Sequence, residues 1–61
     1  MQTIYQINGF KDRREYLEYL SDINAIELED VQTMADLLGE NEDFDGLVTE
    51  LSDFALFSRG R

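Results

Sequence analysis

The chain has 61 residues, with 5 basic and 14 acidic side chains and a formal net charge of −9. It contains no cysteine or histidine, which excludes disulfide bridges, thiolate metal sites and the most common general base. With 43% apolar residues and no apolar run near the roughly 18 residues of a membrane span, the composition predicts one small folded domain over residues 1–61. The segment 1–5 lacks the basic and apolar regions of a signal peptide, so we expect a cytoplasmic protein.

The N-terminal segment 1–9 is predicted to contain a short β-strand. The run Thr3–Ile7 is rich in β-branched and aromatic residues, and the pair Asn8-Gly9 ends it. A lone strand leaves its backbone groups unpaired and therefore needs a partner. The C-terminal segment 54–57, a second copy of the chain and an edge strand of a target remain open as partners.

The body of the chain, 10–57, is predicted to form three helices, followed by a tail over 58–61. The helices are expected at 11–24, at 28–38, and from 43 to 54 or 57. The apolar positions that recur at helical spacing, and are expected to be buried, are Tyr16, Leu17, Tyr19, Leu20 and Ile23, then Leu28, Val31, Met34, Ala35 and Leu38, then Phe44, Leu47, Val48, Leu51, Phe54 and Ala55. Ile26 is expected to pack between the first two helices. The predicted fold class is therefore mainly α, a small three-helix domain with a short N-terminal β segment.

Charge is distributed very unevenly along the chain. Residues 15–58 contain thirteen carboxylates and no basic residue. A one-signed surface attracts cationic partners and repels phosphate, so we expect a protein partner with a basic surface and no direct contact with nucleic acid or membrane. The alternative interpretation is that the acids only keep the domain in solution.

The acidic residues recur at helical spacing opposite the apolar stripes, which predicts a partner-binding acidic face. Its members are Glu15, Glu18, Asp22, Glu29, Asp36, Glu40, Glu42, Asp43, Asp45, Glu50 and Asp53. Like charges at this spacing destabilise a helix, so an array without countercharges favours a role in binding. Such an array imitates the phosphates of nucleic acid and would suit the basic groove of a nuclease or another nucleic-acid-binding protein.

One segment suggests a metal site. Asn41, Asp43 and Asp45 stand at positions 1, 3 and 5 of a loop that resembles an EF-hand or dockerin calcium loop, with Gly46 at position 6. Position 12 is Ser52, which cannot supply the bidentate carboxylate that calcium needs. A calcium-binding module is therefore the least favoured function, and we expect no metal and no cofactor.

The function we expect is that of a non-enzymatic acidic protein-binding domain. No histidine is present to activate a serine, and the four glycines are isolated from one another, so no phosphate-binding loop and no enzyme is expected. In size, charge and lack of catalytic groups the chain is similar to small phage or mobile-element inhibitors of defence nucleases; this likeness is one of composition. The alternative is a small homo-oligomeric or adaptor domain, possible as a homodimer, that binds through an apolar face made by Tyr5, Tyr16, Tyr19, Leu56 and Phe57.

Overall fold

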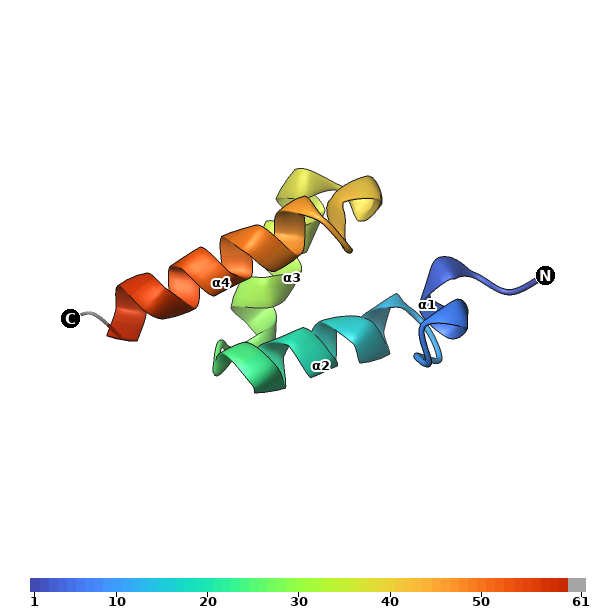
Figure 1. The fold of residues 1–61 in the computed structure, drawn as a ribbon, viewed down its shortest axis with the longest axis horizontal. Helices are drawn as coiled ribbons and strands as arrows, with labels where there is room; N and C mark the ends of the chain where they lie inside the picture. Colours follow the sequence, from blue (N-terminus) through green and yellow to red (C-terminus); the bar gives the residue numbers. More distant parts are fainter. Residues whose placement is uncertain (60–61) are drawn as a thin grey trace.

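Three long helices and two short helical turns make up the computed structural model, which describes residues 1–59 and the side chains of residues 1–56. The elements are α1 (Ile4–Ile7), α2 (Arg13–Asn24), α3 (Leu28–Leu38), the 3₁₀ turn η1 (Glu40–Glu42) and α4 (Gly46–Arg59). The prediction of a mainly α domain with three principal helices is confirmed (Figure 1). Helix α4 continues two residues into the predicted tail, and the rest of that tail lies outside the described residues.

The N-terminal segment is not a strand, so the predicted β segment is wrong. Residues Ile4–Ile7 form one helical turn, and Thr3 caps it by accepting a hydrogen bond from the Gln6 backbone N–H at 3.2 Å. The Gln6 side chain in turn accepts from the Thr3 N–H at 3.0 Å, which completes a capping box. These two bonds and the burial of Tyr5 outweigh the β propensity of the segment, because no strand is present in the described residues to pair with it.

Helix α2 begins two residues later than predicted and ends where predicted. The Asp12 side chain caps its first turn by accepting from the Glu15 N–H at 3.0 Å. At its C-terminal end Ala25 adopts the left-handed conformation, with φ 54° and ψ 42°. The Ala25 N–H donates to the Asp22 carbonyl at 3.3 Å, and the Ile26 N–H donates to the Ser21 carbonyl at 3.1 Å. This is a Schellman motif with alanine in the position that glycine usually takes.

Replacement of Ala25 by glycine is expected to stabilise the domain by about 0.5–1 kcal/mol, because glycine adopts the left-handed conformation without the steric cost of a Cβ. Gly39→Ala is a control that should have the opposite effect and destabilise the domain. Gly39 has φ 90° and ψ 159°, a region that only glycine populates readily. It is expected to cost about 1–3 kcal/mol, all of it from the backbone, because a Cβ there meets no atom within 4 Å. Urea unfolding of both variants measures the two effects, and a loss of stability in Ala25→Gly would contradict the first.

Helix α3 has the predicted bounds, whereas α4 begins three residues later than predicted. Between them lie Gly39 and η1, followed by a turn in which the Asp45 N–H donates to the Glu42 carbonyl at 3.1 Å. The predicted first residue of this helix, Asp43, is instead held inside the fold by its own hydrogen bonds and has 0% of its surface exposed.

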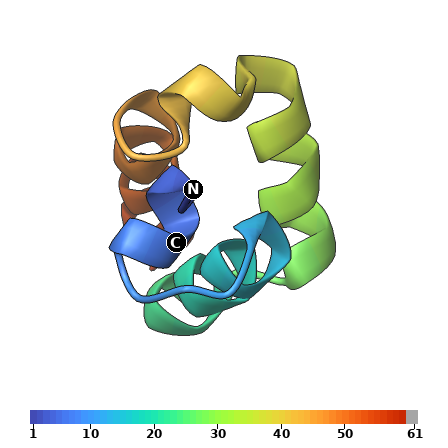
Figure 2. The ribbon, with the colours of Figure 1, turned by 90° about the vertical axis from the view of Figure 1, so that its right-hand side faces the viewer.

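The three long helices enclose one apolar core. Helices α2 and α4 run side by side in nearly the same direction, and α3 crosses behind both of them (Figures 1 and 2). The core consists of Tyr5, Tyr16, Leu17, Leu20, Ile26, Val31, Ala35, Leu47 and Leu51. The expected inward packing of Ile26 is thereby confirmed, and α1 adds Tyr5 at the end of the bundle where α2 and α4 begin.

Five positions that were predicted to be buried are exposed. Tyr19 and Ile23 on α2 are 47% and 55% exposed, and Leu38, Val48 and Phe54 are 38–41% exposed. With one helix crossing behind a pair, only part of each apolar stripe finds a neighbour to pack against. Of these five positions, Ile23 lines a groove between α2 and α4, and Leu38 lines one between α3 and α4.

Candidate partner-binding surface

Most of the predicted acidic face lies on the surface of the molecule. Nine of its residues are exposed, namely Glu15, Glu18, Asp22, Glu29, Asp36, Glu40, Asp45, Glu50 and Asp53. Glu42 is half-buried, and Asp43 is fully buried. Asp43 therefore does not belong to a surface that a partner contacts.

The acidic residues surround the helices and do not form one face. Glu29 and Asp36 are both exposed on α3, and Asp36 Oδ1 lies 3.5 Å from Nη1 of Arg13 on α2. The exposed acids are thus distributed over all three long helices.

Two of the described cations are already engaged inside the domain. Arg14 Nε lies 3.2 Å from Glu18 Oε2 in an exposed pair of the kind that contributes little to stability. Arg13 Nε lies 2.7 Å from Asp43 Oδ2, and Arg13 Nη1 lies 3.5 Å from Asp36 Oδ1. Among the side chains that the structure describes, the other exposed carboxylates have no cation within ion-pair distance; they include Asp22, Glu29, Glu40, Asp45, Glu50 and Asp53.

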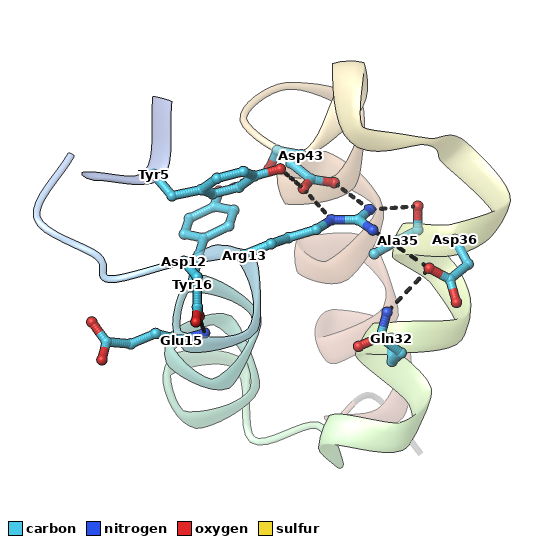
Figure 3. Close-up of polar contacts among 9 residues, drawn as sticks. All are labelled: Tyr5, Asp12, Arg13, Glu15, Tyr16, Gln32, Ala35, Asp36 and Asp43. Atoms are coloured by element: carbon cyan, nitrogen blue, oxygen red, sulfur yellow. Dashed lines mark hydrogen bonds and ion pairs between the residues drawn. The ribbon is translucent and has the colours of Figure 1, made fainter. Parts of the chain in front are cut away.

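Asp43 is the centre of a buried polar network that joins α1, α2 and α3 to the segment before α4 (Figure 3). Its Oδ2 accepts from the Tyr5 hydroxyl at 2.6 Å and from Arg13 Nε at 2.7 Å, and its Oδ1 accepts from Arg13 Nη2 at 3.1 Å. The same Nη2 donates to the Ala35 carbonyl at 3.1 Å, and the Tyr16 hydroxyl donates to the Asp43 carbonyl at 2.8 Å. In the described part of the chain, no buried side-chain polar atom lacks a partner. The network thus holds four segments together.

The network also changes the acid–base properties of two tyrosines. Burial raises the pKa of Tyr5 to about 12, and its hydrogen bond to the Asp43 carboxylate and the charge of that carboxylate act in the same direction. Burial raises the pKa of Tyr16 to about 12, with a further contribution from the charge of Asp43. The hydrogen bond to Asp43 raises the pKa of Arg13 above its ordinary value, so the guanidinium stays charged at all ordinary pH values.

The segment that resembles a calcium loop has another role in this conformation. Residues 40–42 form the η1 turn, and both carboxylate oxygens of Asp43 accept from Arg13 or Tyr5. In the part of the chain that the structure describes, no three carboxylates are grouped as ligands for a metal ion. Asn41, Asp43 and Asp45 are thus not brought together as a binding site.

The apolar surface predicted as the alternative interface is only partly exposed. Tyr5 and Tyr16 are buried, whereas Tyr19 and Leu56 are exposed. The side chain of Phe57 lies outside the described residues. An interface through Tyr5 or Tyr16 would require the core to open.

A groove between α2 and α4 was not anticipated. It has a volume of about 280 Å³ and is lined by Ile23, Asn24, Ser52, Ala55 and Leu56. The spacing of Ile23 and Leu56 in the sequence predicts an apolar face at each position, but it does not reveal that the two faces meet. A smaller groove of about 120 Å³ lies between α3 and α4, lined by Met34, Leu37, Leu38 and Glu50.

No protein-family model matches the chain, and comparison with curated proteins and with solved structures likewise finds no match. Within the described residues, none of the helices combines the length and the apolar character needed to cross a membrane.

Proposed function

We propose that this protein is a non-enzymatic binding domain whose acidic surface binds a basic surface of another protein in the cytoplasm. The observation that carries the proposal is the pairing of Arg13 and Arg14 with carboxylates of the domain itself; among the side chains of residues 1–56, most exposed acids have no countercharge. With a net charge of −9, these acids create a field that accelerates encounter with a cationic surface.

The more specific form of the proposal is a nucleic-acid mimic that inhibits a nuclease or another nucleic-acid-binding protein, as phage and mobile-element inhibitors of host defence do. Exposed carboxylates on α2, α3 and α4 support this form, because a groove that wraps nucleic acid contacts its ligand from several sides. An inhibitor of this kind competes with DNA or RNA for the same groove. Competition by free nucleic acid therefore distinguishes it from a domain that binds elsewhere on its partner.

We expect charge reversal on α4 to abolish partner binding without unfolding the domain. Glu50 and Asp53 are exposed and lie off the buried Leu47–Leu51 row, so Glu50→Lys plus Asp53→Lys should retain its helical circular dichroism. The test is affinity capture from lysate at low and high salt, followed by titration of the identified partner. Binding to wild type should weaken as salt rises, because ions screen exposed charges beyond roughly 10 Å at 0.1 M.

Two further variants sharpen this test. The neutral pair Glu50→Gln plus Asp53→Asn should fall between wild type and the reversed pair, and Glu15→Lys plus Glu18→Lys tests the acids of α2 in the same way. If all three variants bind like wild type and salt has no effect, the acids only keep the domain in solution and the proposal fails.

The second candidate is an adaptor domain that binds through an apolar surface. The groove lined by Ile23 and Leu56 favours it, because apolar side chains 55% and 67% exposed are costly to leave in water. Leu56→Ala separates the two candidates, since Leu56 bears no charge and is not part of the core. The adaptor is favoured if Leu56→Ala loses partner binding and if binding of the wild-type domain does not depend on salt.

A further inference from the structure

The groove between α2 and α4 is open to solvent, and its lining combines the apolar Ile23, Ala55 and Leu56 with the polar Asn24 and Ser52. Ile23 of α2 faces Ser52, Ala55 and Leu56 of α4 across it. Tyr19 lies one turn before Ile23, and Val48 lies one turn before Ser52, and both are exposed. Two exposed apolar rows thus flank the same side of the α2–α4 pair.

The fold itself determines which part of this side stays uncovered. Behind the pair, α3 covers the inner faces (Figures 1 and 2). At the end where α2 begins, Tyr5 and Phe10 cover the aromatic rings of Tyr16 and Phe44, with ring centroids 5.0–5.9 Å apart. At the other end, where α2 stops at Asn24, none of the described segments covers the groove. The open stretch on α4 from Val48 to Leu56 is about 12 Å long, or two turns of a helix.

Carboxylates lie along the outer edge of each apolar row. On α2, Glu15 and Asp22 are seven residues apart and follow the row of Tyr19 and Ile23 on its solvent side. On the other side of the groove, Asp53 lies three residues before Leu56 and so beside it on the surface of α4, and Asp45 stands directly before the first residue of α4. All four acids are exposed, and none has a cation within ion-pair distance among the described side chains. The groove is therefore a partly apolar channel with exposed carboxylates on both sides.

We propose that this groove binds a basic amphipathic α-helix of another protein. The apolar side chains of that helix, spaced i, i+3, i+4 and i+7, would fill the channel between Ile23 and Leu56, and its flanking lysines and arginines would meet the acidic edges. Helix α3 already packs against the same pair from behind, so the bound helix would complete a four-helix arrangement. This inference rests on the proposed function, for which it identifies the chemistry of the partner.

Charge complementarity selects this occupant over a second copy of the chain. Two copies carry −9 each, and a symmetric contact through this groove would place acidic edges against acidic edges. A cationic helix instead neutralises both edges and buries both apolar rows.

The probe for a direct test is a fluorescently labelled 14-residue peptide of leucine and lysine with leucines at helical spacing. Two control peptides are used, one with glutamate in place of every lysine and one with the same composition in alternating order. We expect the wild-type domain to bind the first peptide at least about tenfold more tightly than either control, as measured by fluorescence anisotropy. Equal binding of the helical and alternating peptides would overturn the inference, because charge alone would then explain the binding.

Variants of the domain locate the site. Ile23→Ser plus Leu56→Ser should weaken binding of the helical peptide at least about tenfold, while the control Leu37→Ser should leave it unchanged. Leu37 is 81% exposed and lines the groove between α3 and α4. Leu37→Ser therefore makes the same kind of apolar-to-polar change, but outside the proposed site. Circular dichroism of each variant verifies that the fold is retained, as expected for exposed positions.

The outcomes separate the inference from the proposed function. Asp22→Asn plus Asp53→Asn should weaken binding and reduce its dependence on salt, whereas Glu29→Gln plus Glu40→Gln, on the α3 side, should have a smaller effect. If binding depends on salt and acids but not on Ile23 and Leu56, the proposed function stands and the groove inference fails. If binding depends on Ile23 and Leu56 but not on acids or salt, the occupant is an apolar helix and the proposed function fails. A dimer in sedimentation that the Ile23 and Leu56 changes dissociate would overturn the inference in favour of a second copy.

Discussion

Replacement of Asp43 by alanine is expected to cost about 3–5 kcal/mol, because it leaves the half-buried Arg13 guanidinium with only the longer 3.5 Å contact to the exposed Asp36. Asp43 has 0% of its surface exposed and accepts three side-chain hydrogen bonds at 2.6–3.1 Å, two from Arg13 and one from Tyr5. Domains of this size have total stabilities of roughly 3–9 kcal/mol, so the variant is expected to be largely unfolded. Far-UV circular dichroism and urea unfolding measure the effect.

The neighbouring acid provides a matched control. Asp45 is exposed, and its side chain takes part in none of the hydrogen bonds found in the described residues, so Asp45→Ala should change the stability by no more than about 0.5 kcal/mol. Tyr5→Phe removes only the 2.6 Å bond and should cost about 1–3 kcal/mol, which keeps the experiment informative if Asp43→Ala does not fold.

A double-mutant cycle separates the ion pair from its surroundings. Arg13→Ala plus Asp43→Ala should lose less stability than the sum of the single changes, since neither charge is then left unpaired. If Asp43→Ala unfolds at the same urea concentration as Asp45→Ala, the buried network does not stabilise the fold.

The helices were predicted well because their signals are local. The bounds of α3 follow from an apolar stripe of helical period that ends at Gly39, a residue suited to the positive φ of 90° found there. The end of α2 at Asn24 follows in the same way from the end of its stripe. The N-terminal turn has a local signal too, since Thr3 and Gln6 have the spacing of a capping box, whereas the β propensity of Thr3–Ile7 favours a strand.

Asp43 could not be recognised from the sequence as a buried residue. It lies in a run of acids that all look alike, and its partners Arg13 and Tyr5 are 30 and 38 residues away. No local sequence pattern connects Asp43 with these two partners. The network becomes visible only when α1 and α2 pack against the segment before α4. The same reason explains why Asp43 appeared among the predicted surface acids and among the predicted calcium ligands.

The open groove was hidden for a related reason. Helical period predicts which side of α2 is apolar, but it does not indicate whether a neighbour covers the whole length of that side. Tyr16, Leu17 and Leu20 find neighbours, while Tyr19 and Ile23, on the edge of the same stripe, do not. Incomplete covering of an amphipathic helix is therefore a property of the tertiary arrangement, and here it coincides with the candidate binding surface.

Raising the pH from 10 to 12 is expected to unfold the domain, since the pKa values of Tyr5 and Tyr16 are raised from 10 to about 12. Below pH 10 both tyrosines are protonated in the folded and the unfolded chain, so their contribution to stability is fully present. Between pH 10 and 12 the unfolded chain releases these protons while the folded chain retains them, and stability falls as pH rises. The slope approaches about 1.4 kcal/mol per pH unit for each tyrosine.

The combined loss by pH 12 is about 5 kcal/mol, which is comparable with the whole stability of a domain of this size. Urea unfolding followed by circular dichroism at several pH values between 8 and 12 measures the slope. Tyr16→Phe should start from a lower stability, because the hydroxyl no longer donates to the Asp43 carbonyl, but its stability should fall less steeply with pH. Tyr5→Phe plus Tyr16→Phe should remove most of the slope, and any slope that remains measures the general repulsion of a chain that becomes more negative. A wild-type stability that stays constant to pH 12, or a double variant as steep as wild type, would contradict the assignment of this transition to the two buried tyrosines.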